Sequence, residues 1–127
     1  YGSREGISKN ILRIIDEVVR ETKKNRGTYI NLLFNYGSRK EIEDAIKKIR
    51  ITKKKRLDFR KYLYIPESND PDLIIRTGGE QRLSNFLLWQ SAYSELYFTK
   101  TLWPDFKISA LNKALNNYFK RTRKIGK

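Results

Sequence analysis

The stretch "DLIIRTGGEQRLSNF", residues 72–86, contains three consecutive apolar residues at 73–75. Two glycines, 78 and 79, follow shortly after, and beyond them the sequence becomes mostly polar. A short run of Leu and Ile bounded by turn residues is typical of a strand that is covered on both faces. Strands of this kind occur mainly in parallel sheets with helices on either side. The stretch therefore predicts an α/β fold with a buried strand over residues 72–77.

Apolar periodicity predicts the other elements. Ser8 is the expected N-cap of the first helix, and "SRKE" at residues 38–41 matches a capping box that begins the second. The expected helices cover residues 8–24, a segment from residue 38 onward and a segment from about Asp105, and the expected further strands cover residues 28–34 and 94–98. The expected buried stripes are Ile42, Ala45, Ile46 and Ile49 in the second helix, and Ile108, Leu111, Leu115, Tyr118 and Phe119 in the last. Together these elements predict a mostly parallel sheet flanked by helices.

The length and the charge narrow the functional classes. The chain has 127 residues, enough for one compact domain with one hydrophobic core, and a net charge of +14. So basic a chain suits an anionic partner: nucleic acid, an anionic membrane surface or a phosphorylated substrate. No reading helix, GXXG loop or aromatic RNP strand occurs in the expected context, so nucleic acid is not the expected partner. Seven Lys or Arg residues lie between positions 50 and 61, which indicates a solvated connector or a segment attracted to a membrane.

The residue types that are missing exclude some chemistry. The chain contains no His and no Cys, which removes the usual general base and the thiolate and imidazole ligands of zinc. The lack of Cys fits a reducing cytoplasm, and no apolar run is long enough to cross a bilayer. The chain also has no Met and begins with Tyr1, from which we expect it to be part of a longer protein.

The end of the predicted strand has the composition of an anion site. Arg76 is followed by two glycines, whose backbone N–H groups no side chain would obstruct. Arg82 and Ser84 can converge on the same place if the glycines turn the chain, and Glu80 could orient one guanidinium or merely neutralise it. Two Arg forks and a hydroxyl suit the oxygens of a diphosphate better than a single carboxylate. A structural Arg network remains the alternative.

Glu95 is the second candidate, because it stands in the otherwise apolar and aromatic segment "AYSELYF". A carboxylate in such surroundings needs a partner. The partner could be an Arg, as in a buried ion pair, or Mg²⁺, which prefers one or two carboxylates together with substrate phosphate oxygens. Composition alone favours the ion pair.

Three segments in the same order resemble a known family. The segment "DPDLIIRTGGEQRLSNFLLWQSAYSELYFTKTLWPDF", residues 70–106, closely resembles the signature region of the cis-prenyltransferases, which include undecaprenyl and dehydrodolichyl diphosphate synthases. "FNYGSRKEI", residues 34–42, resembles the family's second motif, with Ser38 where Gly is usual. "RTRKIG", residues 121–126, resembles its closing motif.

The resemblance implies roles for the candidate residues. Arg76, Arg82 and Ser84 would grip the diphosphate of isopentenyl diphosphate, Glu80 would help to order the loop, and Glu95 would be the Mg²⁺-associated carboxylate. The implied reaction condenses isopentenyl diphosphate with an allylic diphosphate to a Z-polyprenyl diphosphate, with Mg²⁺ as cofactor. The resemblance further implies a homodimer or a heterodimer in the cytoplasm, with transient, peripheral contact with a membrane.

Two departures from the family pattern qualify this expectation. The Asp-Gly-Asn-Gly-Arg loop of the family's N-terminal half, which binds the allylic diphosphate, occurs nowhere in residues 1–127. The chain therefore resembles the C-terminal part of a single cis-prenyltransferase domain and is expected to be inactive alone. In the tail, Lys124 stands where the family has Arg, and Lys lacks the bidentate fork. A non-catalytic subunit of a heteromeric enzyme is the main alternative, and a basic nucleic-acid-binding module is a weaker one.

Overall fold

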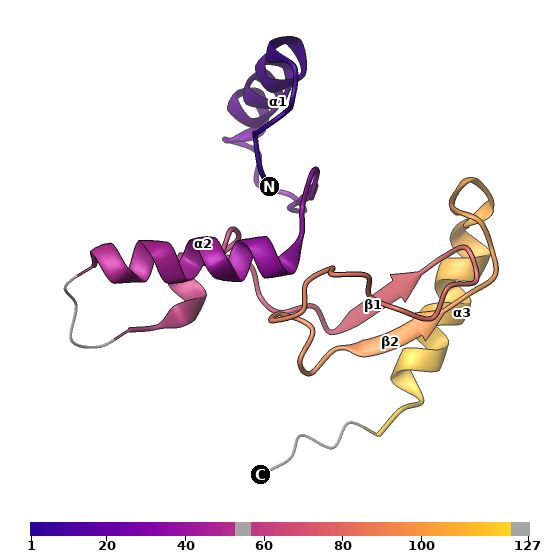
Figure 1. The fold of residues 1–127 in the computed structure, drawn as a ribbon. Helices are drawn as coiled ribbons and strands as arrows, with labels where there is room; N and C mark the ends of the chain where they lie inside the picture. The colour runs from indigo at the N-terminus through magenta and orange to yellow at the C-terminus, as the bar shows by residue number, and fades with distance from the viewer. Residues whose placement is uncertain (53–56, 123–127) are drawn as a thin grey trace. The chain divides into compact units, whose positions relative to one another are not determined.

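The computed structural model describes residues 1–52 and 57–122. The chain divides into two compact units, Tyr1–Pro66 and Glu67–Lys127 (Figure 1). In chain order the elements, with η for a 3-10 helix, are α1 (Lys9–Thr22), α2 (Ser38–Ile51), η1 (Phe59–Tyr62), β1 (Leu73–Arg76), β2 (Glu95–Phe98), η2 (Trp103–Asp105) and α3 (Ile108–Phe119). Among the described residues only three apolar side chains are buried, namely Ala45, Leu63 and Ala114. This differs from the single core expected from the chain length.

The strands β1 and β2 form a parallel pair, as their apolar composition predicted. The register pairs Leu73 with Glu95 at the amino end and Arg76 with Phe98 at the carboxyl end. The helix α3 packs against β2 (Figure 1). The predicted α/β class, with parallel strands flanked by helices, is confirmed, and both predicted strands of this unit lie within one or two residues of their expected limits.

The helix α3 buries a stripe that differs at its ends from the predicted one. Ala114 is fully buried, whereas Ile108 is 70% exposed and Phe119 is 75% exposed. These two residues are the first and the last of the helix. The expected start near Asp105 was also early, because Trp103–Asp105 forms a 3-10 turn and the α-helix follows it.

In the first unit, α1 begins where the sequence predicted. The Ser8 Oγ accepts a hydrogen bond from the N–H of Ile11 at 3.5 Å, which confirms Ser8 as the N-cap. The helix ends at Thr22, two residues before its expected limit at residue 24. None of its residues is buried, and Val19 is 61% exposed. The apolar side chains of α1 are therefore only partly covered by the described residues.

The capping box predicted for α2 was wrong. Gly37 is the N-cap, and Ser38 is already the first helical residue and is fully buried. The Glu41 carboxylate accepts hydrogen bonds from the Tyr36 hydroxyl and from the Tyr64 N–H, outside the helix. The buried stripe is also shorter than predicted, because Ala45 is fully buried but Ile46 is exposed.

The strand predicted over residues 28–34 was wrong. The segment forms no regular strand, and Tyr29 is 86% exposed. Its contacts with the start of the chain include hydrogen bonds from the Tyr1 amino group to the Leu32 carbonyl and from the Phe34 N–H to the Tyr1 carbonyl. Apolar composition indicates the ability to be buried, but a strand needs a paired neighbour along its length. No strand among the described residues supplies one.

The basic connector predicted over residues 50–61 is partly helical. Arg50 lies in the last turn of α2, and η1 begins at Phe59. Residues 53–56 of this prediction lie outside the described residues. In the part of the chain that the structure describes, no helix is long and apolar enough to cross a membrane.

Candidate functional site

The carboxyl end of β1 is tied to the segment that follows β2. The N–H of Thr99 donates to the Arg76 carbonyl at 3.0 Å. Beyond Arg76, the N–H groups of Gly78 and Gly79 donate to the carbonyls of Thr101 and Thr99, at 2.9 and 2.8 Å. These bonds fix the start of the loop that carries the other candidate residues.

The two glycines are required by backbone conformation rather than by space. Gly78 and Gly79 have φ angles of +87° and +83°, in the left-handed region that residues with a Cβ adopt at a cost. A Cβ at Gly78 would meet no atom within 4 Å, and one at Gly79 would lie 3.9 Å from Lys100. Because both N–H groups are already bonded to carbonyls, they are not open to an anion as the sequence suggested. An anion at this end of the sheet would be held mainly by side chains.

The loop after the glycines folds back onto the end of β1. Ser84, Asn85 and Leu87 all have positive φ angles, which turn the chain sharply. As a result, the loop's apolar side chains share a cavity of about 290 Å³ with the carboxyl end of β1. The residues that line this cavity are Ile74, Ile75, Arg76, Thr77, Leu83 and Phe86. The structure thus brings the loop containing Arg82 and Ser84 to the end of the strand where Arg76 lies, although neither residue lines the cavity.

Arg82 and Glu80 form an ion pair on the surface of this loop. The Arg82 side chain is 61% exposed and the Glu80 side chain is 49% exposed. An exposed pair of this kind contributes little to stability, about 0–1 kcal/mol. The pair does restrict the orientation of the Arg82 guanidinium. The guanidinium nevertheless stays accessible from the solvent.

Glu95 lies at the opposite end of the strand pair from Arg76. It pairs with Leu73, the first residue of β1, and is therefore separated from the level of Arg76 by three residues, or about 10 Å along the strands. Its Oε2 accepts a hydrogen bond from the Arg121 Nη1 at 2.6 Å. The described residues contain no group of three carboxylate, His or Cys side chains that could hold a metal ion. The structure does not bring Glu95 together with Arg76, and it shows the ion pair that composition favoured.

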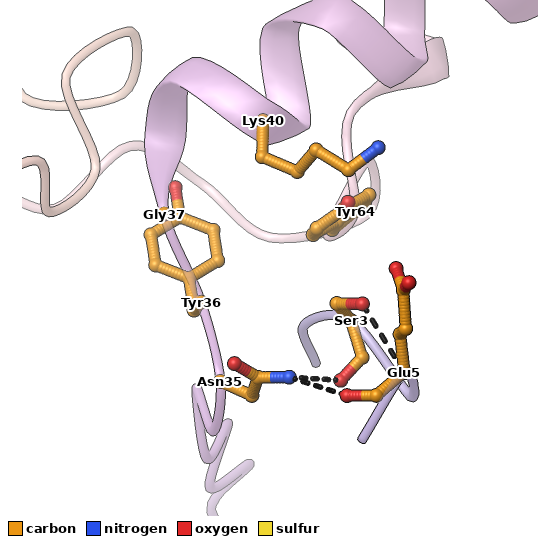
Figure 2. Close-up of a pocket in the computed structure, with 7 residues that line it drawn as sticks. All are labelled: Ser3, Glu5, Asn35, Tyr36, Gly37, Lys40 and Tyr64. Carbon is orange, nitrogen blue, oxygen red and sulfur yellow. Dashed lines mark hydrogen bonds between the residues drawn. The ribbon is translucent and has the colours of Figure 1, made fainter. Parts of the chain in front are cut away.

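The second motif forms a separate pocket in the first unit (Figure 2). The pocket has a volume of about 430 Å³ and is lined by Ser3, Glu5, Asn35, Tyr36, Gly37, Lys40 and Tyr64. Asn35 has a φ angle of 51°, and its Nδ2 donates to the carbonyls of Ser3 and Glu5, both at 3.0 Å. Its amide therefore holds the start of the chain against the start of α2.

Beside this pocket lies a polar network that sequence reasoning missed. Glu41 is fully buried, and its two oxygens accept from the Tyr36 hydroxyl at 2.5 Å and from the Tyr64 N–H at 2.8 Å. Asp44, one helical turn further on, accepts from the Tyr64 hydroxyl and from the Lys40 Nζ, both at 2.7 Å. The spacing of three residues between Glu41 and Asp44 indicates that both lie on one face of α2. Their tyrosine partners, Tyr36 and Tyr64, lie outside the helix.

The network changes the titration of two of its members. Hydrogen bonds from Lys40 and from the Tyr64 hydroxyl lower the pKa of Asp44 to about 2. Burial, together with the hydrogen bond to Asp44, raises the pKa of Tyr64 to about 12. Because these polar groups already have partners within the network, the pocket is better explained as a structural junction than as a ligand site.

Comparisons with known proteins agree with the order of the motifs. A family profile described as putative undecaprenyl diphosphate synthase matches residues 1–126. The isoprenyl transferase of Thermotoga maritima is 49% identical over 98% of this chain, and that of Aquifex aeolicus is 43% identical over 99%. The chain covers 57% and 56% of these two proteins, so it spans little more than half their length.

Solved structures show the same similarity in three dimensions. Lavandulyl diphosphate synthase from Lavandula x intermedia, in complex with dimethylallyl diphosphate, matches with a TM-score of 0.93 and 34% identity, over 100% of this chain and 58% of that one. A probable undecaprenyl diphosphate synthase from Campylobacter jejuni matches with a TM-score of 0.90 and 32% identity, over 100% and 61%. The chain belongs to the cis-prenyltransferase family.

Proposed function

We propose that the protein is a cis-prenyltransferase and that this chain carries its isopentenyl diphosphate site. The observation that supports the proposal is the loop of residues 77–87, which folds back so that Leu83, between Arg82 and Ser84 in the chain, shares a cavity with Arg76. This arrangement occurs in a chain that is 49% identical to an isoprenyl transferase.

The side chains at this end suit a diphosphate. Arg76 and Arg82 each supply a planar fork of donors, and Ser84 adds a hydroxyl. Charge-assisted hydrogen bonds from Arg to phosphate oxygens are among the strongest in proteins. The ion pair between Glu80 and Arg82 would keep the guanidinium extended before the ligand arrives. The bound diphosphate would then compete with Glu80 for Arg82.

In the proposed reaction, the allylic C–O bond breaks and its electron pair leaves with the diphosphate. The double bond of isopentenyl diphosphate forms the new C–C bond to the allylic carbon, and loss of a proton to the released diphosphate creates the Z double bond of the product. No nucleophilic side chain takes part, which is consistent with a chain that has neither His nor Cys. The role of this chain is to hold the five-carbon donor by its diphosphate.

Mg²⁺ is also part of the proposal, with Glu95 as the carboxylate that would hold it. When bound, the cation would stabilise the charge of the departing diphosphate. The carboxylate is chemically suited to Mg²⁺, but Arg121 holds it at 2.6 Å, and this ion pair would have to open first.

The remaining parts of the proposed enzyme lie outside this chain. The allylic diphosphate would bind to the Asp-Gly-Asn-Gly-Arg loop of the family, which does not occur in these 127 residues, so the chain alone is proposed to be inactive.

We further propose a dimer, whether of identical or of different subunits. The strongly basic chain would favour transient contact with an anionic membrane, where a polyprenyl product would be released.

The proposed site is tested by comparing the binding of isopentenyl diphosphate to the wild type and to Arg82→Ala. The experiment contains neither Mg²⁺ nor an allylic substrate. We expect binding, measured by calorimetry, to weaken by roughly 10- to 100-fold, the loss typical of a hydrogen bond to a charged group. Arg20→Ala is the matched control, because Arg20 also lies near a glutamate, Glu17, at 4.0 Å on an exposed surface. Arg20→Ala should bind as the wild type does.

Other outcomes would count against the proposal. Wild-type binding that Arg82→Ala leaves unchanged would place the diphosphate elsewhere. Equal losses in both variants would show that only the total positive charge matters. Retention on an RNA column that falls in Arg82→Ala, while isopentenyl diphosphate binding does not, would favour the nucleic-acid-binding alternative.

A further inference from the structure

We propose that Arg121 is a positioning residue that holds the Glu95 carboxylate and excludes a divalent cation from it until the ion pair opens. This inference rests on the proposed function, because it concerns the carboxylate to which that function assigns Mg²⁺. It adds a residue, Arg121, that neither the proposed diphosphate site nor the proposed metal ligand includes.

The geometry joins Arg121 to two acceptors at once. Its Nη1 donates to the Glu95 Oε2 at 2.6 Å, and its Nε donates to the Asn117 Oδ1 at 3.0 Å. Asn117 lies in the last turn of α3, and Glu95 is the first residue of β2. The guanidinium is therefore fixed in one orientation, and it connects the end of the helix to the start of the strand.

The Arg121–Glu95 pair is better sheltered from water than the Arg82–Glu80 pair. The Arg121 and Glu95 side chains are 37% and 24% exposed, compared with 61% and 49% for Arg82 and Glu80. Shelter from water strengthens both the attraction to Glu95 and the repulsion between the guanidinium and an incoming cation. A cation that reaches Glu95 must therefore break two hydrogen bonds and displace a like charge.

Removal of Arg121 would take the ion-pair partner away from the Glu95 carboxylate. The Glu95 N–H donates to the Asp72 carbonyl at 2.9 Å, which fixes the backbone that carries this carboxylate. Mg²⁺ and Mn²⁺ are hard cations that accept one or two carboxylates and keep several waters. Without Arg121, the Glu95 carboxylate would be the group that such a cation binds.

The test uses Mn²⁺ as a paramagnetic substitute for Mg²⁺ and needs no enzymatic activity. Backbone amide resonances of the full chain are recorded by NMR during titration with Mn²⁺, in the wild type and in Arg121→Gln. We expect the amides of residues 95 and 96 to broaden in Arg121→Gln at a roughly fivefold lower Mn²⁺ concentration than in the wild type. Arg121→Gln/Glu95→Gln should lose this selective broadening.

Two further variants separate exclusion by charge from a general structural effect. Arg121→Lys keeps the charge and should exclude Mn²⁺ as the wild type does. Lys113→Gln removes one positive charge from α3 at a residue without a role in the Glu95 ion pair, and it too should match the wild type. Thermal unfolding of each variant checks that the fold is retained.

The proposal is overturned if Arg121→Gln binds Mn²⁺ near Glu95 no more tightly than the wild type, including the case in which neither binds. It is also overturned if Lys113→Gln gains as much as Arg121→Gln. These results do not depend on isopentenyl diphosphate. Failure of this inference is therefore distinguishable from failure of the proposed diphosphate site, which is tested in the absence of metal.

Discussion

Asp44 is the residue whose ionisation the structure constrains most clearly. Hydrogen bonds from Lys40 and Tyr64 lower its pKa from 3.8 to about 2 in the folded chain. A carboxylate with a depressed pKa stabilises the fold above its unfolded pKa, and this stabilisation is lost as the pH falls through the folded value. The contribution is therefore complete at neutral pH and declines between about pH 4 and pH 2.

Asp44→Asn tests this contribution. We expect the substitution to lower the free energy of unfolding by about 1 kcal/mol at pH 7, a value reduced for the partial exposure of the pair. The difference from the wild type should shrink as the pH falls below 4 and vanish near pH 2, as measured by urea unfolding. The control is Asp58→Asn, because Asp58 lies 3.7 Å from Lys61 on a more exposed surface. A difference that persists unchanged at pH 2 would contradict the assignment.

At the scale of single residues, the sequence identified candidate side chains better than it identified their partners. The order of Arg76, Gly78 and Gly79 predicted a turn at the end of a strand, and the structure has one. The bonding of the glycine N–H groups to Thr99 and Thr101 could not be foreseen, because it depends on where the segment after β2 lies. The same holds for Glu95, whose partner Arg121 is 26 residues away in the chain.

At the scale of elements, composition and capping residues predicted an element correctly where the structure supplies the partner that the element needs. The strands β1 and β2 pair with each other, and α1 has its cap at Ser8, so the sequence predicted all three. Residues 28–34 have the composition of a buried strand but are exposed, because no described strand pairs with them. The capping box at Ser38 was wrong because Glu41 is drawn into a network with Tyr64.

Gly79 determines the shape of the loop that carries Arg82. Gly79→Ala places a Cβ whose nearest neighbour, Lys100, is 3.9 Å away, so the cost comes from the φ angle of +83° and amounts to about 1 kcal/mol. We expect the free energy of unfolding to fall by this amount and isopentenyl diphosphate binding to weaken severalfold, because the loop relaxes. Gly27→Ala is the control, since nothing lies within 4 Å of its Cβ position and its φ is not positive. Binding that survives intact in Gly79→Ala would show that the loop conformation does not position Arg82.

At the scale of the whole molecule, the dominant property is a net charge of +14. An excess of one charge attracts anions over distances comparable to the Debye length, which is about 30 Å at 0.01 M salt and about 8 Å at 0.15 M. Binding of a diphosphate should therefore have two parts, a local part from Arg76 and Arg82 and a long-range part from the remaining basic residues. Only the long-range part is strongly reduced by salt.

Salt titration of isopentenyl diphosphate binding separates these two parts. The substitution of Lys107, Lys113 and Lys120 by Gln takes the net charge from +14 to +11 without altering a candidate diphosphate ligand. We expect this variant to bind more weakly than the wild type at about 0.01 M salt and to approach it at about 0.15 M, because screening removes the difference. Arg82→Ala should instead bind more weakly at both concentrations, since its contacts are local. If the triple variant stays equally weak at both concentrations, these three lysines in and beside α3 contact the ligand directly, and the site is larger than the end of β1.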